Sequence, residues 1–139
     1  MKYMLDTNIC IYAVKRKFDC LAEKLFSQSK KNICISSIVK SEIEYGICKS
    51  AVPEKNRWAF EILLQGISIL PYDESAAKEY GEIRAALERQ GKPIGGNDLL
   101  IAAHCRALNY ILVTHNLKEF SRVENLEIED WTVENDSLD

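Results

Sequence analysis

The stretch Tyr3-Met4-Leu5-Asp6-Thr7-Asn8 at the N-terminus decides how the rest of the sequence is interpreted. Residues 3–5 form a short apolar run that predicts a first β-strand, and Asp6 follows at the position where that strand should end. The next two residues carry side-chain oxygens suited to capping a helix that begins with Ile9. In an open parallel sheet, ligands bind outside the carboxyl ends of the strands. Asp6 is therefore a candidate site residue, and the alternative is that it only caps a helix.

Length and composition indicate one domain. A chain of 139 residues, of which 47% are apolar, is sufficient to build a full hydrophobic core. No run approaches the ~20 apolar residues of a membrane span, and the N-terminal apolar stretch is too short for a signal peptide. We therefore expect a soluble, cytoplasmic protein without membrane association. The five cysteines are widely spaced and form no CxxC pair, which favours reduced, mostly buried thiols over disulfides or a zinc site.

The net charge of −3 conceals an uneven distribution. Residues 1–122 carry eighteen basic and fourteen acidic side chains, a balance of +4, whereas seven acidic residues and no basic one follow Arg122. A body of positive charge is compatible with a nucleic-acid substrate but does not demand one. We assign residues 1–131 to one domain and expect residues 132–139 to form an acidic, disordered tail.

Short apolar runs alternate with amphipathic segments along the chain. Further strands are predicted at residues 33–35, 67–70 and 110–113, with a weak fifth strand beginning at 126–128. Helices are predicted between the strands, from Ile9, over 18–29, from Ser36 or Ser37 to about 49, from Pro53, from Asp73 or Ser75, and from Asn97-Asp98. Strands separated by helices imply crossover connections, and hence an α/β fold with a mostly parallel central sheet covered on both faces.

Three further acidic residues stand near the ends of predicted strands and helices. Glu42 lies on the border of the buried face of its helix, Asp98 is in the first turn of a nearly all-apolar helix, and Glu119 follows the fourth strand. Each has an ordinary alternative: an exposed helical glutamate, an acid that complements a helix dipole, or a partner for a surface lysine. Together with Asp6 they form the set expected where oxygen ligands hold a hard divalent cation for phosphoryl chemistry. Mg²⁺ takes one or two direct carboxylates and keeps several waters, so histidine is not required.

Four stretches carry a resemblance to a known family: Met4-Leu5-Asp6-Thr7-Asn8, Glu42 in a Ser-x-x-x-x-Glu context, Gly91-Lys92-Pro93-Ile94 followed by Asn97 to Ala103, and Val113-Thr114 to Phe120. They resemble the PIN domain family, and within it the VapC toxins of bacterial type II toxin–antitoxin pairs. The resemblance covers residues 1–131. Its most specific part is the Asn-Asp-x-x-Ile-Ala-Ala segment at this distance from an N-terminal Asp-Thr-Asn. The implied fold is an α/β/α sandwich.

The resemblance also implies the activity, that of a Mg²⁺- or Mn²⁺-dependent endoribonuclease toxin. Asp6 and Asp98 match the principal metal ligands of the family, and Glu42 matches its third acid. Many members place an aspartate where this chain has Asn116, so Glu119 is the nearest substitute for the fourth position. The expected catalytic set is therefore Asp6, Glu42, Asp98 and Glu119.

Partners are implied in the same way. A small VapB-like antitoxin should silence the toxin and should make most of the contacts to operator DNA. The toxin itself is expected to form a homodimer within a hetero-oligomer. Ile47, Trp58 and Ile62 could line a groove for an amphipathic antitoxin peptide, with ordinary core packing as their alternative role.

RNA is the expected substrate, with transfer RNA among the candidates. The acids repel an RNA backbone until a cation enters, so basic residues at the rim are needed, and Arg84, Arg89 and Lys92 are candidates. His104 lies within the apolar helix and is expected to be a structural residue rather than a ligand.

Three alternative functions belong to other classes, and a fourth belongs to the same fold. A receiver domain would have paired acids after the first strand and a lysine after the last central strand, where this chain has Asp6-Thr7 and Thr114-His115. A phosphotransferase with an aspartyl nucleophile would have a second aspartate where Asn8 stands. A non-catalytic binding protein would leave the four acids unexplained. A DNA-directed or structure-specific nuclease of the same fold stays open, because metal chemistry does not distinguish the sugar.

Overall fold

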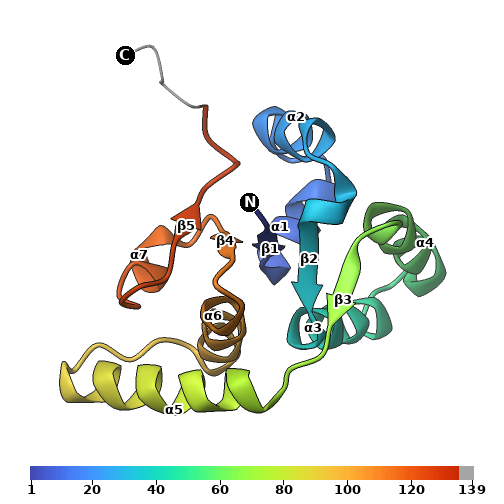
Figure 1. Cartoon of the computed structure of the whole chain (residues 1–139). Coiled ribbons are helices and arrows are strands. Elements are labelled where there is room, and N and C mark those ends of the chain that lie inside the picture. The colour runs from blue at the N-terminus through green and yellow to red at the C-terminus, as the bar shows by residue number, and fades with distance from the viewer. Residues whose placement is uncertain (135–139) are drawn as a thin grey trace.

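The computed structural model describes residues 1–134. Its central element is one sheet of five parallel strands (Figure 1). Its order is β3-β2-β1-β4-β5, with β1 Tyr3–Leu5, β2 Ile33–Ser36, β3 Ser68–Leu70, β4 Ile111–Val113 and β5 Ile128–Glu129. The helices of the described residues are α1 Thr7–Val14, α2 Asp19–Ser27, α3 Ser37–Cys48, α4 Pro53–Leu64, α5 Glu74–Arg89, α6 Gly96–Leu108 and α7 Leu117–Phe120, with a 3-10 turn at Lys30–Asn32. The predicted α/β fold with a parallel sheet is confirmed.

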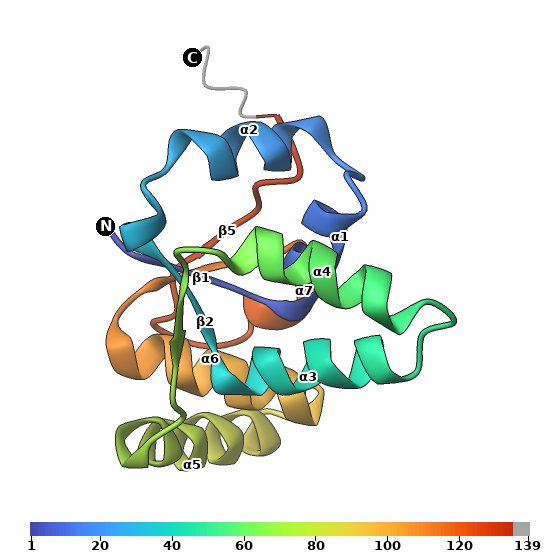
Figure 2. The same cartoon turned by 90° about the vertical axis from the view of Figure 1, so that its right-hand side faces the viewer.

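Helices cover both sides of the sheet. α5 and α6 lie side by side on one side of the molecule and α2 lies on the opposite side (Figures 1 and 2). α6 packs on β2 and β4, and α1, α3 and α4 contact one another. This arrangement is the expected α/β/α sandwich. Within residues 1–134, no helix is both long and apolar enough to span a bilayer.

The strand order reverses next to β1. The chain places β2 and β3 on one side of β1 and then returns to place β4 and β5 on its other side. Parallel pairing sets Leu5 opposite Val113, so the carboxyl ends of β1 and β4 meet at the same edge. In open parallel sheets this reversal opens a crevice beyond the strand ends, where ligands bind.

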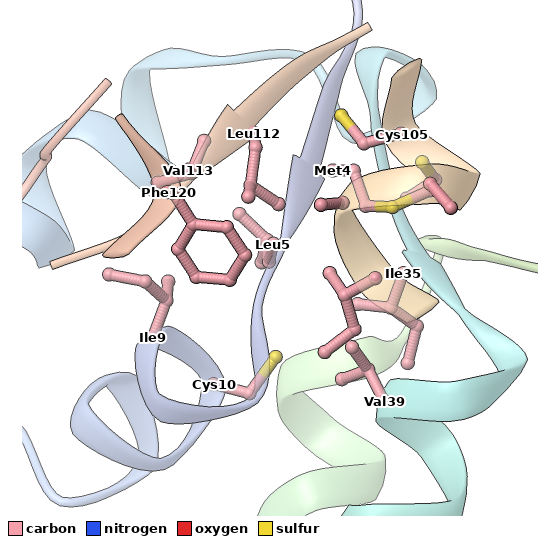
Figure 3. Packing of buried hydrophobic residues seen from close by; sticks show 14 of the residues in the cluster. Met4, Leu5, Ile9, Cys10, Ile35, Val39, Cys105, Leu112, Val113 and Phe120 are labelled. Atoms are coloured by element: carbon pink, nitrogen blue, oxygen red, sulfur yellow. The ribbon is translucent and has the colours of Figure 1, made fainter. Parts of the chain in front are cut away.

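The core fills both faces of the central strands. Met4 and Leu5 are adjacent in β1 and point to opposite faces of the sheet, yet both are fully buried (Figure 3). The Leu5 side chain lies beside the ring of Phe120, and Ile35 lies on the side of Met4 (Figure 3). Burial on both faces explains why these strands are continuous apolar runs in the sequence.

Local capping signals place most helix starts. Pro53 occupies the first turn of α4 as predicted, and Ser36 caps α3 and Asp73 caps α5, in each case one of the two positions that the sequence left open. The prediction for α1 was wrong in its cap: the helix begins at Thr7 rather than Ile9, and the Asp6 carboxylate itself accepts the backbone N–H of Ile9. Asp6 can act in this way because its extended backbone turns the carboxylate back over the first turn.

Two further expectations need correction. Ile47 was a candidate for an exposed groove, but it is only 2% exposed and belongs to the core, since it faces inward from α3. The fifth strand begins at Ile128 rather than 126, because Asn125 adopts a left-handed conformation (φ 61°) just before it. The tail expected over residues 132–139 lies mostly outside the described residues. Its first residue, Thr132, is buried and hydrogen-bonded to Asp130.

Candidate active site

Asp6 stands at the reversal point of the sheet. Its backbone N–H donates to the carbonyl oxygen of Val113 at 3.1 Å, which continues the β1–β4 pairing one residue past the strands. Its carboxylate accepts the N–H of Ile9 at 2.9 Å and a hydrogen bond from the Thr114 hydroxyl at the matching end of β4. Asp6 is 5% exposed. Asp6 is therefore both a helix cap and a buried carboxylate of the crevice. Its role as a cap does not exclude a role in the site.

Glu42 is held by two other helices. The Thr7 hydroxyl of α1 donates to its Oε1, and the side-chain amide of Asn97 in α6 donates to its Oε2 at 3.0 Å. Glu42 itself belongs to α3. Three helices that are distant in sequence therefore fix one carboxylate, which gives it a defined orientation at the edge of the crevice. Sequence reasoning missed the role of Asn97, although its place beside Asp98 was a signal.

Asp98 and Glu119 form a carboxyl pair. A protonated Asp98 donates a hydrogen bond to Glu119, and burial together with this bond raises the pKa of Asp98 to about 7. The same bond, with help from the Asn116 amide, lowers the pKa of Glu119. Asn116 donates to Glu119 at 2.7 Å and caps α7, so it orients the fourth acid. Two carboxyl groups that face each other in this way need a proton or a cation between them.

Asp130 is an acid that sequence reasoning missed. Burial would raise its pKa, but hydrogen bonds from Thr132 and His115 outweigh burial and lower it, so Asp130 is ionised. The His115 Nδ1 lies 2.9 Å from its Oδ2. The charge of Asp130 reaches Asp6, where it helps to raise the pKa. No signal in the sequence marked this residue, because it follows the short edge strand β5.

The four predicted acids converge. Burial raises the pKa of Asp6 to about 6, and the charges of Glu42 and Asp130 act in the same direction against the hydrogen bonds from Thr114 and Ile9. The pKa of Asp98 responds in turn to Glu119, Asp6 and Glu42. Mutual perturbation of this kind occurs where like charges share a desolvated site, and it marks candidate functional residues.

The donor set suits a hard divalent cation. The acids and the side chains that hydrogen-bond to them offer carboxylate, hydroxyl and amide oxygens, which Mg²⁺ and Mn²⁺ prefer. Within residues 1–134, no three His, Cys, Asp or Glu side chains are arranged to ligate one ion together. A Mg²⁺ site needs only one or two direct carboxylates, because waters complete its shell.

Two other predicted residues are placed by the structure. His104 is buried, and its Nδ1 lies 2.7 Å from the Ser36 hydroxyl, with its ring against Tyr72. It is a structural residue, as expected. Arg84 pairs with Glu88 at 3.1 Å and donates to the Tyr80 hydroxyl at 2.9 Å. Its role at the rim stays a prediction, as do those of Arg89 and Lys92.

The fold and its acidic edge define a class: small α/β/α proteins whose site is built from carboxylates at the carboxyl ends of parallel strands. Residues 3–126 match the model of the PIN domain. The chain is 45% identical over 95% of its length to the tRNA(fMet)-specific endonuclease VapC of Shigella flexneri, covering 99% of that protein. It is 46% identical over 94% of its length to ribonuclease VapC2 of Rickettsia felis, covering 98% of that protein.

Solved structures agree with these relatives. The VapBC2 complex of Rickettsia felis bound to a promoter DNA fragment contains a chain with a TM-score of 0.88 and 45% identity, covering 94% of this chain and 99% of that one. The VapBC-1 complex of nontypeable Haemophilus influenzae gives a TM-score of 0.85 and 39% identity, covering 96% and 100%. The chain therefore belongs to the PIN domain family and to its VapC branch.

Proposed function

We propose that this chain is the ribonuclease toxin of a toxin–antitoxin pair and that it hydrolyses RNA with Mg²⁺ or Mn²⁺ at the site of Asp6, Glu42, Asp98 and Glu119. The observation that carries the proposal is that four carboxylates from separate elements lie close enough for their charges to raise the pKa values of Asp6 and Asp98. Relatives named as RNA-cleaving enzymes, one of them specific for tRNA(fMet), support it.

Asp6 and Asp98 would hold the metal ion directly. When bound, such an ion lowers the pKa of a coordinated water and neutralises charge on the scissile phosphate. Asp6 is oriented for this task by Thr114 and by the start of α1. Glu42 is fixed from both sides and serves to orient water.

Glu119, set in place by the Asn116 amide, completes the set from the β4 side. Without a cation, the pKa of about 7 leaves the Asp98–Glu119 pair protonated in about half of the molecules at neutral pH. A cation held by Asp98 would neutralise the charge of this pair in place of that proton. Asp130 stays ionised behind Asp6 and adds to the negative field that attracts the ion.

The activity test uses two substitutions at the metal ligands. Asp6→Asn and Asp98→Asn should each abolish cleavage, because an amide is a poor ligand for Mg²⁺, while the fold stays intact. Asp73→Asn is the matched control: Asp73 also caps a helix, but on α5 and outside the acidic set. Full cleavage by either site variant would remove that residue from the metal site.

The substrate test compares nucleic acids. Initiator tRNA, an elongator tRNA and a single-stranded DNA of equal length are incubated with the parent, with Mg²⁺ or with EDTA. We expect metal-dependent cutting of RNA, with initiator tRNA preferred because a close relative is named for it. Cutting of DNA at an equal rate would favour the alternative, a DNA-directed nuclease of the same fold.

An antitoxin is the expected partner, since similar solved chains come from VapBC complexes. An apolar cavity of about 500 Å³ lies between α1, α2 and α4 and is lined by residues that include Leu25, Phe26 and Ile62. Phe26 is 93% exposed, which is unusual for a ring of this size. We place an amphipathic antitoxin helix in this cavity, which would extend the predicted role of Ile62.

The partner test is co-expression with the small protein encoded beside the chain. The two should purify as one complex with suppressed cleavage. Phe26→Glu should break the complex, and Tyr45→Glu is the control, because Tyr45 is also exposed but lies on α3 outside the cavity lining. Recovery of the chain alone from the co-expressing cells would contradict the assignment.

A further inference from the structure

We propose that Tyr12, His115 and Lys17 form a subsite that stacks one base of the RNA strand beside the acidic site and pairs with its phosphate. The proposal rests on the ribonuclease function above and specifies where the strand lies. It commits to a flanking nucleotide of the substrate as the occupant, in preference to the antitoxin.

Three rings meet at this surface. The Tyr12 and His115 centroids are 6.1 Å apart at 80°, and the Phe18 ring lies 5.3 Å from Tyr12 and 5.7 Å from His115. Tyr12 and Phe18 are half-buried, whereas the side chain of His115 is 46% exposed. His115 is therefore the outermost ring of the cluster, backed by two others. Aromatic rings displayed in this way are the platforms on which proteins stack unpaired bases.

The His115 ring is fixed in orientation. Its Nδ1 lies 2.9 Å from the Asp130 carboxylate and 2.8 Å from the Thr132 hydroxyl. Since an ionised carboxylate only accepts, Nδ1 carries a hydrogen, and no hydrogen bond among residues 1–134 uses Nε2. A pre-oriented exposed ring loses little entropy on binding, and its second nitrogen is left for a ligand.

Uncompensated positive charge lies next to the rings. The Lys17 Nζ is 4.9 Å from the Tyr12 centroid and 5.6 Å from that of Phe18. Arg16 adopts a left-handed conformation (φ 53°), and this turn brings the Lys17 N–H back to the Tyr12 carbonyl at 3.0 Å. Within residues 1–134, no ion pair uses Lys15, Arg16 or Lys17. A phosphate would supply the counter-charge that the described protein does not.

The cluster is continuous with the acidic site. His115 directly follows Thr114, whose hydroxyl donates a hydrogen bond to Asp6. Asp130 is hydrogen-bonded to His115, and its charge helps to raise the pKa of Asp6. A strand with one phosphate at the acids would therefore have a neighbouring nucleotide close to the rings. The antitoxin alternative is weaker, because the apolar cavity includes Phe18 and Arg16 in its lining but none of Tyr12, Lys17 and His115.

The test uses the RNA that the parent cuts. The cut bond is mapped, and a series of short RNAs spanning it is made, each with one abasic nucleotide. For the parent, one abasic position next to the cut should lower kcat/KM by roughly 5- to 150-fold, the equivalent of ~1–3 kcal/mol for one stacked base. His115→Ala should lower kcat/KM on intact RNA by a similar factor and abolish the penalty at that position alone.

Two variants separate stacking from other effects. His115→Phe keeps a ring but loses the bond to Asp130, so the positional penalty should remain. Lys17→Gln should raise KM and reduce the salt slope of binding by about one phosphate contact. The matched controls are Tyr45→Ala and Lys49→Gln on or next to α3, where a lysine also lies 4.9 Å from an exposed tyrosine ring, and both should behave as the parent.

The outcomes are distinct. If His115→Ala lowers kcat/KM equally on every RNA of the series, no base stacks there and the proposal is wrong. If it weakens only antitoxin binding, the surface belongs to the antitoxin and the proposal is again wrong. If the parent cuts no RNA at all, the ribonuclease function itself fails, and the subsite fails with it.

Discussion

The proton shared by Asp98 and Glu119 makes the stability of the metal-free protein depend on pH. The folded pKa of Asp98 is about 7, above its ordinary value of 3.8. Between these values the folded state holds a proton that the unfolded state has lost, so stability falls as pH rises from about 4 to about 7. The lowered pKa of Glu119 acts in the opposite sense, but only below its ordinary value of 4.5.

Asp98→Asn should therefore stabilise the metal-free protein at pH 8. Asn can donate to Glu119 as protonated Asp98 does, and it removes a charge that is raised in energy by burial and by three neighbouring acids. After discounting for solvent screening of this half-exposed group, we expect about 1 kcal/mol, or a rise in Tm of ~4 °C. At pH 5 the gain should be smaller, because folded Asp98 is then protonated, and it should vanish only below about pH 4, where the unfolded state keeps that proton too. Thermal melts in EDTA at both pH values provide the measurement, and an equal or lower Tm at pH 8 would leave Asp98 as a helix-terminal charge only.

Thr7 and Asn97 act through Glu42. Thr7→Val keeps the shape of the side chain but removes the hydroxyl that donates to Oε1, and Asn97→Ala removes the donor to Oε2. Each should lower kcat/KM by about 10- to 100-fold, the usual cost of losing a residue that orients a metal-site carboxylate. Ser41→Ala, next to Glu42 but bonded only to the Ser37 carbonyl, is the control. Parent-like rates in both variants would show that Glu42 needs no orientation.

At the scale of elements, Asp6 joins α1 to the site. Its carboxylate accepts the Ile9 N–H at 2.9 Å and so caps the helix. Asn caps about as well as Asp, whereas Ala does not, so Asp6→Asn should be more stable than Asp6→Ala by ~1 kcal/mol while both are inactive. Urea unfolding in EDTA measures the difference. Equal stability of the two variants would mean that the cap contributes nothing and that Asp6 serves the site alone.

At the scale of the whole molecule, metal binding should couple to folding. The convergent acids exist only in the folded chain, so an ion that binds them stabilises the fold by about 2.7 kcal/mol at 100 times its Kd. Millimolar Mg²⁺ should raise the Tm of the parent and release the proton of the Asp98–Glu119 pair. Asp98→Asn should lose most of this response. Calorimetry in two buffers of different protonation enthalpy would detect the proton, and a response that survives in the variant would place the ion elsewhere.

The sequence by itself determined the order of the strands and of the longer helices, and it identified the four acids as candidates, whereas the short helix α7 was not predicted. Apolar runs, Pro53 and the caps at Ser36 and Asp73 are local signals, because each depends on residues within one turn or one strand. The strand before Asp6 is buried on both faces, so its residues form a continuous apolar run. The polar Asp6 therefore marked the end of the strand in the sequence. Asp98 was predicted in the first turn of α6 because the apolar helical segment begins directly after it.

Only the tertiary structure decided which side chains meet. Thr7 and Glu42 are 35 residues apart, and Asn97 lies 55 residues beyond Glu42, yet all three join in one hydrogen-bond network. Asp130 reaches the site because β5 pairs with β4 in parallel. His115 lies against Tyr12 because β4 and β1 also pair in parallel, and each of these residues follows one of those strands. Strand order and register fix these contacts through burial of the whole core, and no local pattern of residues encodes a distance across the sheet.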